Sequence, residues 1–176
     1  YRTLDRSSKH FRRRAQAEAV KGAFDLLSDP VRRALASLGI SELTPVQEEA
    51  IPVVLSGQNA LIIAPTGTGK TEAALAPVLD MYLRYRRRIG VLYITPLRAL
   101  NRDLLRRLRA WAEALDLDVE VRHGDTAQHV RRAQARRPPD VLITTPETLQ
   151  AMLPSKSMRP HLAHVRWVCL LYTSDA

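Results

Sequence analysis

The sequence predicts an α/β domain in which a parallel sheet is covered by helices on both faces. Short apolar runs alternate with longer segments of helical periodicity, which is the pattern of βαβ units. A glycine-rich turn follows the first apolar run and opens a helix, a setting in which main-chain amides bind phosphate. With 176 residues, 45% of them hydrophobic and 26% charged, the chain suits one globular domain with a substantial core.

Two helices are predicted ahead of the first strand. Asp29-Pro30 marks the start of one, because proline at the first helical position lacks only an N–H that would be unpaired there. Apolar residues follow at helical spacing, and Gly39 can end the helix. Thr44-Pro45 repeats the start signal, so a second helix is expected over residues 47–55. Residues 1–22 are basic and polar and are expected to form a separate arm or a frayed helix.

The alternating part of the chain begins after these helices. Strands are expected over residues 60–63, 91–94, 119–121, 141–143 and 165–168. Helices are expected from about residue 70 and over residues 97–115, 127–136 and 146–153. Because a helix separates each pair of strands, the strands should run parallel. The pattern stops at the fifth strand, so we expect a fold that is incomplete at its C-terminal end.

Charge and cysteine usage limit the class of protein. The net charge is +9 and almost all cations are arginine, which makes bidentate contacts with phosphate. A solvated, arginine-rich surface explains the same excess, so charge alone leaves both interpretations open. The single cysteine, Cys169, excludes a disulfide framework and a multi-cysteine zinc site within the chain. It fits a reducing cytoplasm, where we expect the protein; no apolar run could cross a membrane and no secretory leader is visible.

Residues 64–71 carry the chemistry. They read Ala-Pro-Thr-Gly-Thr-Gly-Lys-Thr between an expected strand and an expected helix, as a P-loop requires. Gly67 and Gly69 let the backbone curl so that its N–H groups point at phosphate oxygens. Lys70 should reach the β- and γ-phosphates and Thr71 should offer its hydroxyl to Mg²⁺, so these two are the candidate catalytic residues. The nucleotide-binding set is Ala64, Pro65, Thr66, Gly67, Thr68, Gly69, Lys70 and Thr71.

Two upstream residues are candidates for the adenine side of a nucleotide. The Gln47 carboxamide carries a donor and an acceptor, so it can pair with the adenine edge in both senses. Phe24 could stack on the base. By itself Gln47 is an ordinary helix-surface residue, and its place shortly before a P-loop makes it informative. The alternative to a P-loop is a glycine-rich turn that happens to carry an exposed lysine.

These segments resemble a known family. Thr44-Pro-Val-Gln47 resembles the Q motif of DEAD-box and related superfamily 2 helicases, and residues 64–71 resemble their motif I with its usual first alanine. Thr95-Pro-Leu-Arg-Ala-Leu100 resembles motif Ia, and Thr144-Thr-Pro-Glu147 resembles motif Ib. His123-Gly-Asp125 matches the glycine-containing loop before motif Ib. The order and spacing of the segments agree with the family as well.

Within this superfamily the sequence is most similar to the large helicase-related (Lhr) proteins. Residues 66–74, 96–100, 123–126 and 142–149 carry that likeness, which covers about residues 24–168. The resemblance implies a RecA-like, P-loop ATP-binding domain over residues 23–168, with ATP and Mg²⁺ as cofactors. It also implies an ATP-dependent helicase or translocase whose parent chain supplies a second RecA-like domain.

The resemblance further implies a nucleic-acid groove on this domain, with DNA as the favoured partner and RNA as the alternative. Threonine hydroxyls and N–H groups at helix starts can bind phosphates without selecting bases, which suits a translocating motor. The groove residues carried over from motifs Ia and Ib are Thr95, Pro96, Leu97, Arg98, Thr145, Pro146 and Glu147.

Other classes of protein stay open at this point. A DEAD-box-like RNA helicase would share all these motifs. A non-motor P-loop NTPase would not need Gln47 or the two Thr-Pro motifs, and a basic RNA-binding protein would leave the P-loop unexplained. His123 has no second metal ligand at suitable spacing and is interpreted as a structural or surface histidine.

The helix expected over residues 97–115 has a clear division of faces. Apolar residues recur at three and four positions along one face, and arginines recur along the other. We interpret Arg102, Arg106 and Arg109 as a solvated charged face, and Arg98, which lies in the motif itself, as functional. The apolar face comprises Leu97, Leu100, Leu104, Leu108, Trp111 and Leu115.

The end of the chain departs from the family pattern. The fifth strand should end in the Asp-Glu pair of motif II, yet the sequence continues as Cys169-Leu-Leu-Tyr-Thr-Ser-Asp-Ala176. These eight residues back-translate into DNA that resembles a transposase adapter used in sequencing libraries. We therefore interpret residues 169–176 as a non-native tail, with a divergent natural terminus as the alternative. Without motif II and a second motor domain, the chain alone is expected to be inactive.

Overall fold

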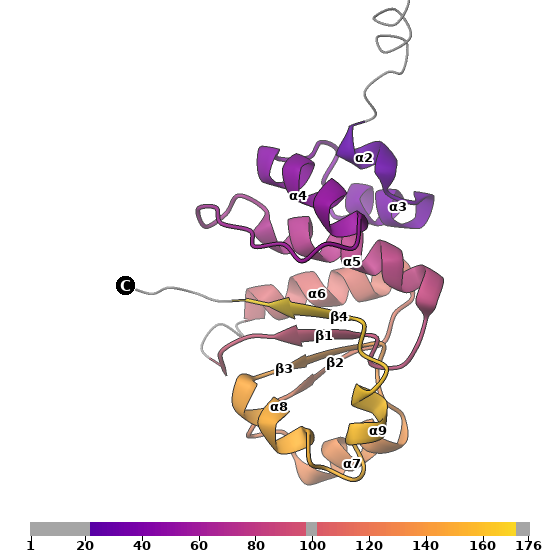
Figure 1. Cartoon of the computed structure of the whole chain (residues 1–176), viewed down its shortest axis with the longest axis vertical. Coiled ribbons are helices and arrows are strands. Elements are labelled where there is room, and N and C mark those ends of the chain that lie inside the picture. The colour runs from indigo at the N-terminus through magenta and orange to yellow at the C-terminus, as the bar shows by residue number, and fades with distance from the viewer. Residues whose placement is uncertain (1–21, 98–101, 172–176) are drawn as a thin grey trace, which may run out of the picture.

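A computed structural model describes residues 22–97 and 102–171 of the chain (Figure 1). The basic segment expected over residues 1–22 therefore lies almost wholly outside the described residues, as do Arg98 and Leu100. The elements in chain order are α2 (Ala23–Leu26), α3 (Asp29–Ser37), α4 (Pro45–Leu55), α5 (Lys70–Tyr85), β1 (Val91–Ile94), α6 (Arg102–Leu115), β2 (Val119–Arg122), α7 (Gln128–Arg136), β3 (Val141–Thr144), α8 (Pro146–Met152), α9 (Arg159–Leu162) and β4 (Trp167–Leu170).

The four described strands form one parallel sheet in the order β2-β3-β1-β4. In the register, Val91 of β1 lies opposite Val141 of β3 on one side and Trp167 of β4 on the other. β1 and β3 are buried at every residue, as expected for central strands that helices cover on both faces. The expected parallel α/β fold is thus confirmed, with β4 starting two residues later than the apolar pattern predicts.

Alternate residues of β1 pack into two separate hydrophobic cores, one on each face of the sheet. Val91 and Tyr93 point into a large cluster shared with α2, α3, α4, α5 and α6. Leu92 and Ile94 point into a smaller cluster with residues of α8 and its neighbours. Figure 1 shows the same arrangement, with α5 and α6 on one side of the sheet and α7, α8 and α9 on the other. This two-faced burial follows from the two-residue period of a strand.

The division of faces expected for α6 is confirmed along the described part of the helix. Its buried side chains are Leu104, Leu108, Trp111 and Leu115, while Arg102, Arg106 and Arg109 are exposed. Leu97 was expected to continue the apolar face, but its side chain is 51% exposed. Leu97 lies ahead of the described part of α6, which begins at Arg102.

Side-chain hydrogen bonds fasten the N-terminal helices to the rest of the domain. The fully buried Asp80 of α5 accepts a bond of 2.7 Å from the Ser28 N–H, just before α3. Glu48 of α4 accepts a bond of 2.9 Å from the Ala23 N–H at the start of α2. Each carboxylate satisfies an N–H that the first turn of a helix leaves without an internal partner.

The expected strand over residues 60–63 is not present, and that prediction was wrong. The segment has no regular secondary structure, and Leu61 and Ile63 are 87% and 84% exposed. An apolar run becomes a strand only when another strand satisfies its N–H and C=O groups. None of the four strands in the described part of the chain pairs with it; β4, at one edge of the sheet, pairs only with β1.

Among residues 22–97 and 102–171, none of the helices combines the length and the apolar character needed to cross a membrane.

The α6 face gives a direct stability test. Replacing buried Leu108 with alanine should lower the free energy of unfolding by about 2–5 kcal/mol, because it removes methyl groups and leaves a cavity. Urea unfolding followed by circular dichroism measures the change. The neighbouring exposed substitution Arg109→Ala should stay within about 0.5 kcal/mol of wild type. Equal effects of the two variants would contradict the assignment of faces.

Cys169 reports on the packing of β4. Burial raises the pKa of its thiol to about 12, so almost no thiolate is present at pH 8. Iodoacetamide should therefore alkylate the folded chain at pH 8 far more slowly than the chain in urea. Mass spectrometry of timed samples measures both rates. Rapid labelling of the folded chain would mean that β4 does not pack Cys169 beside Tyr93, its partner in the register.

Candidate nucleotide site and the residues around it

The glycine-rich turn closes directly onto the longest described helix. Gly67 and Gly69 have φ values of 83 and 86°, a region that residues with a Cβ rarely adopt. α5 begins at Lys70, and no side chain of the described residues caps its N-terminus. A 16-residue helix therefore presents its first amides and the positive end of its dipole to whatever lies in the turn.

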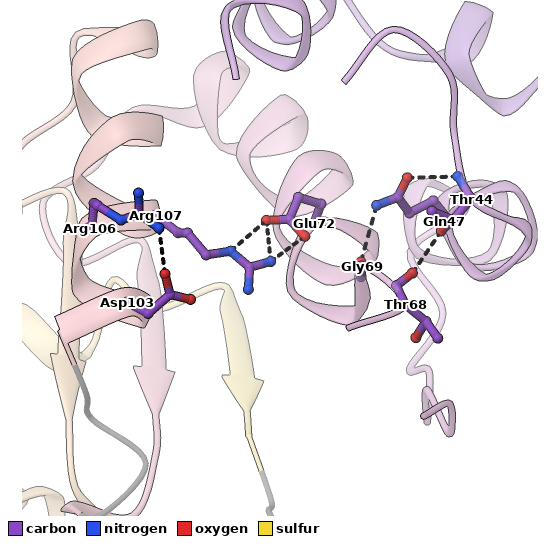
Figure 2. Close-up of polar contacts among 8 residues, drawn as sticks. All are labelled: Thr44, Gln47, Thr68, Gly69, Glu72, Asp103, Arg106 and Arg107. Carbon is purple, nitrogen blue, oxygen red and sulfur yellow. Dashed lines mark hydrogen bonds and ion pairs between the residues drawn. The ribbon is translucent and has the colours of Figure 1, made fainter. Parts of the chain in front are cut away.

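Gln47 of α4 and Thr44, the N-cap residue of that helix, hold this turn through its main chain (Figure 2). The Gln47 Nε2 donates to the Gly69 carbonyl at 3.2 Å, and the Thr44 Oγ1 donates to the Thr68 carbonyl at 2.9 Å. A Cβ on Gly69 would lie 2.3 Å from the Gln47 Nε2. Gly69 is therefore required for its conformation and for the space that Gln47 occupies.

The second polar atom of Gln47 is also engaged. Its Oε1 accepts a bond of 3.0 Å from the Thr44 N–H, which forms a capping box at the start of α4. Gln47 is 2% exposed. An adenine contact by Gln47 would therefore have to form in addition to these two hydrogen bonds or replace one of them. The direct contact between Gln47 and the turn was not foreseen from the sequence.

The lysine of the turn folds back over its own loop. The Lys70 Nζ donates to the carbonyls of Ala64 and Pro65, the latter at 2.8 Å, and the Thr68 Oγ1 donates to the same Pro65 carbonyl at 2.8 Å. Lys70 and Thr71 are both half-buried in the first turn of α5. A flexible ammonium at this position can exchange carbonyl oxygens for phosphate oxygens without moving the helix.

Phe24 packs into the protein. It is half-buried on α2 and lies against the large core cluster that also contains Leu27 and Val31. None of the described hydrogen bonds or ring contacts joins α2 to the glycine-rich turn. The interpretation of Phe24 as a base-stacking residue gains no support from this geometry.

The threonines expected to bind phosphates are buried. Thr95 and Thr145 are 0% and 3% exposed, and the Thr95 N–H donates to the Thr144 carbonyl at 3.0 Å. The Thr145 Oγ1 accepts from the Thr148 N–H at 3.3 Å and so caps α8. In this structure the Thr145 hydroxyl caps α8, and the Thr95 side chain is buried.

The other residues of this group are more accessible. Pro96 and Pro146 are half-buried, while Leu97 and Glu147 are exposed. They follow β1 and β3, which are neighbours in a parallel sheet, so both segments meet at its carboxyl edge. The topology thus brings the two motif segments together, and Arg98 lies outside the described residues.

A partly buried ion pair that sequence reasoning missed joins α5 to α6. Glu72 lies two residues after Lys70, and both of its carboxylate oxygens accept from the Arg107 guanidinium. The side chains are 9% and 36% exposed respectively. No local signal could have paired residues that lie 35 positions apart, although an arginine among the apolar positions of α6 was visible in the sequence.

The histidine loop is a structural turn. The His123 N–H donates to the Thr126 Oγ1 at 2.9 Å, and its Nδ1 accepts from the Asp125 N–H at 3.3 Å. Arg131 of α7 donates to the carbonyls of His123, Gly124 and Thr126. His123 therefore organises a loop, as expected, and Arg131 is the cation that holds that loop.

Comparison with known proteins places these features in a family. The model of the DEAD/DEAH box helicase family matches residues 44–170. The ATP-dependent helicase Lhr-Core of Sulfolobus acidocaldarius is 36% identical over 139 residues, which cover 71% of this chain and 16% of that protein. The Lhr helicase/uracil glycosylase of Escherichia coli is 38% identical over 136 residues, which cover 65% of this chain and 9% of that protein.

A solved structure agrees with the sequence comparisons. The Mycobacterium smegmatis helicase Lhr bound to ssDNA and AMP-PNP matches with a TM-score of 0.76 and 37% identity, over 85% of this chain and 20% of that one. The chain thus spans a fifth or less of the length of each of these three proteins. Its parallel sheet, its glycine-rich turn and the match over residues 44–170 lead to one conclusion: the chain belongs to the DEAD/DEAH box helicase family.

Proposed function

We propose that the chain, over residues 23–168, is the ATP-binding RecA-like lobe of a longer Lhr-type, ATP-dependent nucleic-acid helicase or translocase. The observation that carries the proposal is the uncapped start of α5 behind two glycines of positive φ, with Lys70 and Thr71 in the first helical turn. Such a turn holds a triphosphate through main-chain amides and the helix dipole.

The residues fit a nucleoside triphosphate with Mg²⁺. Backbone N–H groups of residues 66–71 would hold the phosphates, and Lys70 would bind the β- and γ-phosphates once it leaves the carbonyls of Ala64 and Pro65. The Thr71 hydroxyl would be a ligand of Mg²⁺, which neutralises charge on the phosphates when it is bound. Gln47 and Thr44 would keep the turn open and place the adenine beside α4.

The nucleic-acid partner is proposed to lie across the carboxyl edge of β1 and β3. Exposed or half-buried residues of both motif segments gather there, Pro96 and Leu97 after β1 and Pro146 and Glu147 after β3. The net charge of +9 favours a polyanionic partner in general. DNA is favoured because a similar helicase of 37% identity has been solved with ssDNA and AMP-PNP.

A second motor domain of the parent chain would complete the enzyme. The described lobe contributes the phosphate turn, while cleavage also needs a Mg²⁺-binding aspartate and a glutamate that acts on water, which the resemblance would place at the end of β4. We therefore propose that residues 169–176 are non-native and that the chain alone hydrolyses ATP poorly. The sequence of the uninterrupted gene tests this interpretation of residues 169–176. If the gene encodes these eight residues and continues with native sequence after them, the tail is not foreign.

Lys70 gives the central test of this function. In the full-length parent, Lys70→Ala should lower nucleic-acid-stimulated ATP hydrolysis by at least about 100-fold, because one donor to the transferring phosphate is lost. A phosphate-release assay with single-stranded oligo-dT and oligo-U measures the rate and also decides between DNA and RNA. Lys156→Ala removes an exposed lysine elsewhere and should keep the wild-type rate. Unchanged hydrolysis in Lys70→Ala would contradict the proposal.

Gln47 tests the link between α4 and the glycine-rich turn. Gln47→Ala removes both of its hydrogen bonds, each worth about 0.5–1.5 kcal/mol, and should raise the KM for ATP by about fivefold to tenfold. Steady-state kinetics on the full-length parent at saturating oligo-dT measure the change. Glu49→Ala, an exposed substitution on the same helix, serves as the matched control and should leave KM unchanged. Equal KM values in all three proteins would show that Gln47 supports only the fold.

A further inference from the structure

The Glu72–Arg107 pair occupies an unusual position between the two candidate sites. Glu72 lies in the first turn of α5, directly after Lys70 and Thr71. Arg107 lies in α6, the helix that follows the segment 95–97. Figure 2 shows the guanidinium of Arg107 reaching from α6 to the carboxylate of Glu72. The pair therefore joins the helix of the phosphate turn to the helix of the first nucleic-acid segment.

The geometry is that of a fork. The Arg107 Nε donates to the Glu72 Oε1 at 3.1 Å, and its Nη2 contacts both Oε1 and Oε2. Bidentate pairs of this kind are more sensitive to direction than single contacts, because two planar groups must stay aligned. A small shift of α6 against α5 would break the alignment, whereas an ion pair through a lysine would tolerate it.

The burial of Glu72 makes its contact with Arg107 important for how α5 and α6 pack together. The Glu72 side chain is 9% exposed, so its carboxylate depends on Arg107 for the hydrogen bonds that water would otherwise supply. Tyr93 of β1 lies in the same buried cluster as side chains of α5 and α6, and burial raises the pKa of its phenol strongly. Tyr93 is two residues before Thr95, so the strand that leads to the motif segment packs in the same core as α5 and α6.

The adjacent pair on α6 provides a contrast. Arg106 and Asp103 interact at 2.6 Å, with side chains 79% and 58% exposed. A hydrogen bond from Arg106 holds the pKa of Asp103 below its usual range. This exposed pair stays within one helix, and Figure 2 places it on the far side of Arg107 from α5. It matches the buried pair in chemistry but connects no second element.

We infer that Glu72 and Arg107 are positioning residues that couple engagement of nucleic acid at the segment 95–97, which precedes α6, to the arrangement of Lys70 and Thr71. The inference rests on the proposed function. A shift of α6 on binding the strand would pull on the first turn of α5 through the fork. Neither residue touches the nucleotide in this assignment; each acts through the helix that carries Lys70 and Thr71.

The test measures ATP hydrolysis by the full-length parent with and without saturating oligo-dT, together with the unfolding midpoint in urea. Arg107→Gln should lower the ratio of stimulated to basal rate by about tenfold while the basal rate stays within about twofold. Glu72→Gln should lower the ratio similarly, and the double variant should lose no more than either single one, because the two residues act as a unit. Arg107→Lys keeps the charge without the fork and should give an intermediate ratio.

Controls separate the possible outcomes. Arg106→Gln removes the exposed neighbour and should keep the wild-type ratio. A wild-type ratio in folded Arg107→Gln would overturn the inference, and so would an equal loss in Arg106→Gln, which would point to general surface charge. If Arg107→Gln fails to fold, a wild-type ratio in Arg107→Lys has the same effect. If the wild-type protein shows no stimulation by any nucleic acid, the proposed function itself fails.

Discussion

The structure depends on how α5 is held, because the segment that precedes it belongs to no strand. In a parallel α/β unit, a strand usually fixes the start of the next helix through the turn between them. Here residues 60–63 have no regular secondary structure, and Leu61 and Ile63 are exposed, so the first turn of α5 is fixed from the sides. α4 holds the glycine-rich turn through Gln47, and α6 holds Glu72 through Arg107. Asp80 ties the middle of the helix to the start of α3.

These side contacts differ in physical character, and the difference bears on how the site can respond to a ligand. The bonds from α4 go to main-chain carbonyls of Thr68 and Gly69, so they constrain the backbone of the turn whatever its side chains are. The bond from α6 is an ion pair in which the Glu72 carboxylate is largely removed from water, so losing Arg107 would leave that carboxylate buried without its partner. The first kind of contact sets the shape of the turn. The second ties that shape to the position of another helix, so the turn cannot be regarded as independent of α6.

Local sequence signals predicted the elements that depend on local physics. Proline and threonine at helix starts placed α3 and α4, and the apolar run 91–94 coincides with β1. The failure at residues 60–63 has a different origin, because a strand requires a partner and apolar character does not supply one. Pairings between distant residues were equally invisible: nothing in the sequence around Glu72 points to Arg107, or around Gln47 to Gly69. The site residues were therefore identified by type and order, and their contacts only by the fold.

Gln47 illustrates how a residue can be recognised from the sequence while its contacts within the protein are not foreseen. A carboxamide ahead of a phosphate turn was interpreted as an adenine ligand, since it offers one donor and one acceptor. In the fold both groups are used within the protein, one to cap α4 and one to hold Gly69. A base that bound beside Gln47 would compete with these bonds or polarise them, and either effect would reach the phosphate turn through the Gly69 carbonyl. The contact therefore depends on Gly69 as much as on Gln47, because a side chain at position 69 would occupy the space that the Gln47 carboxamide fills.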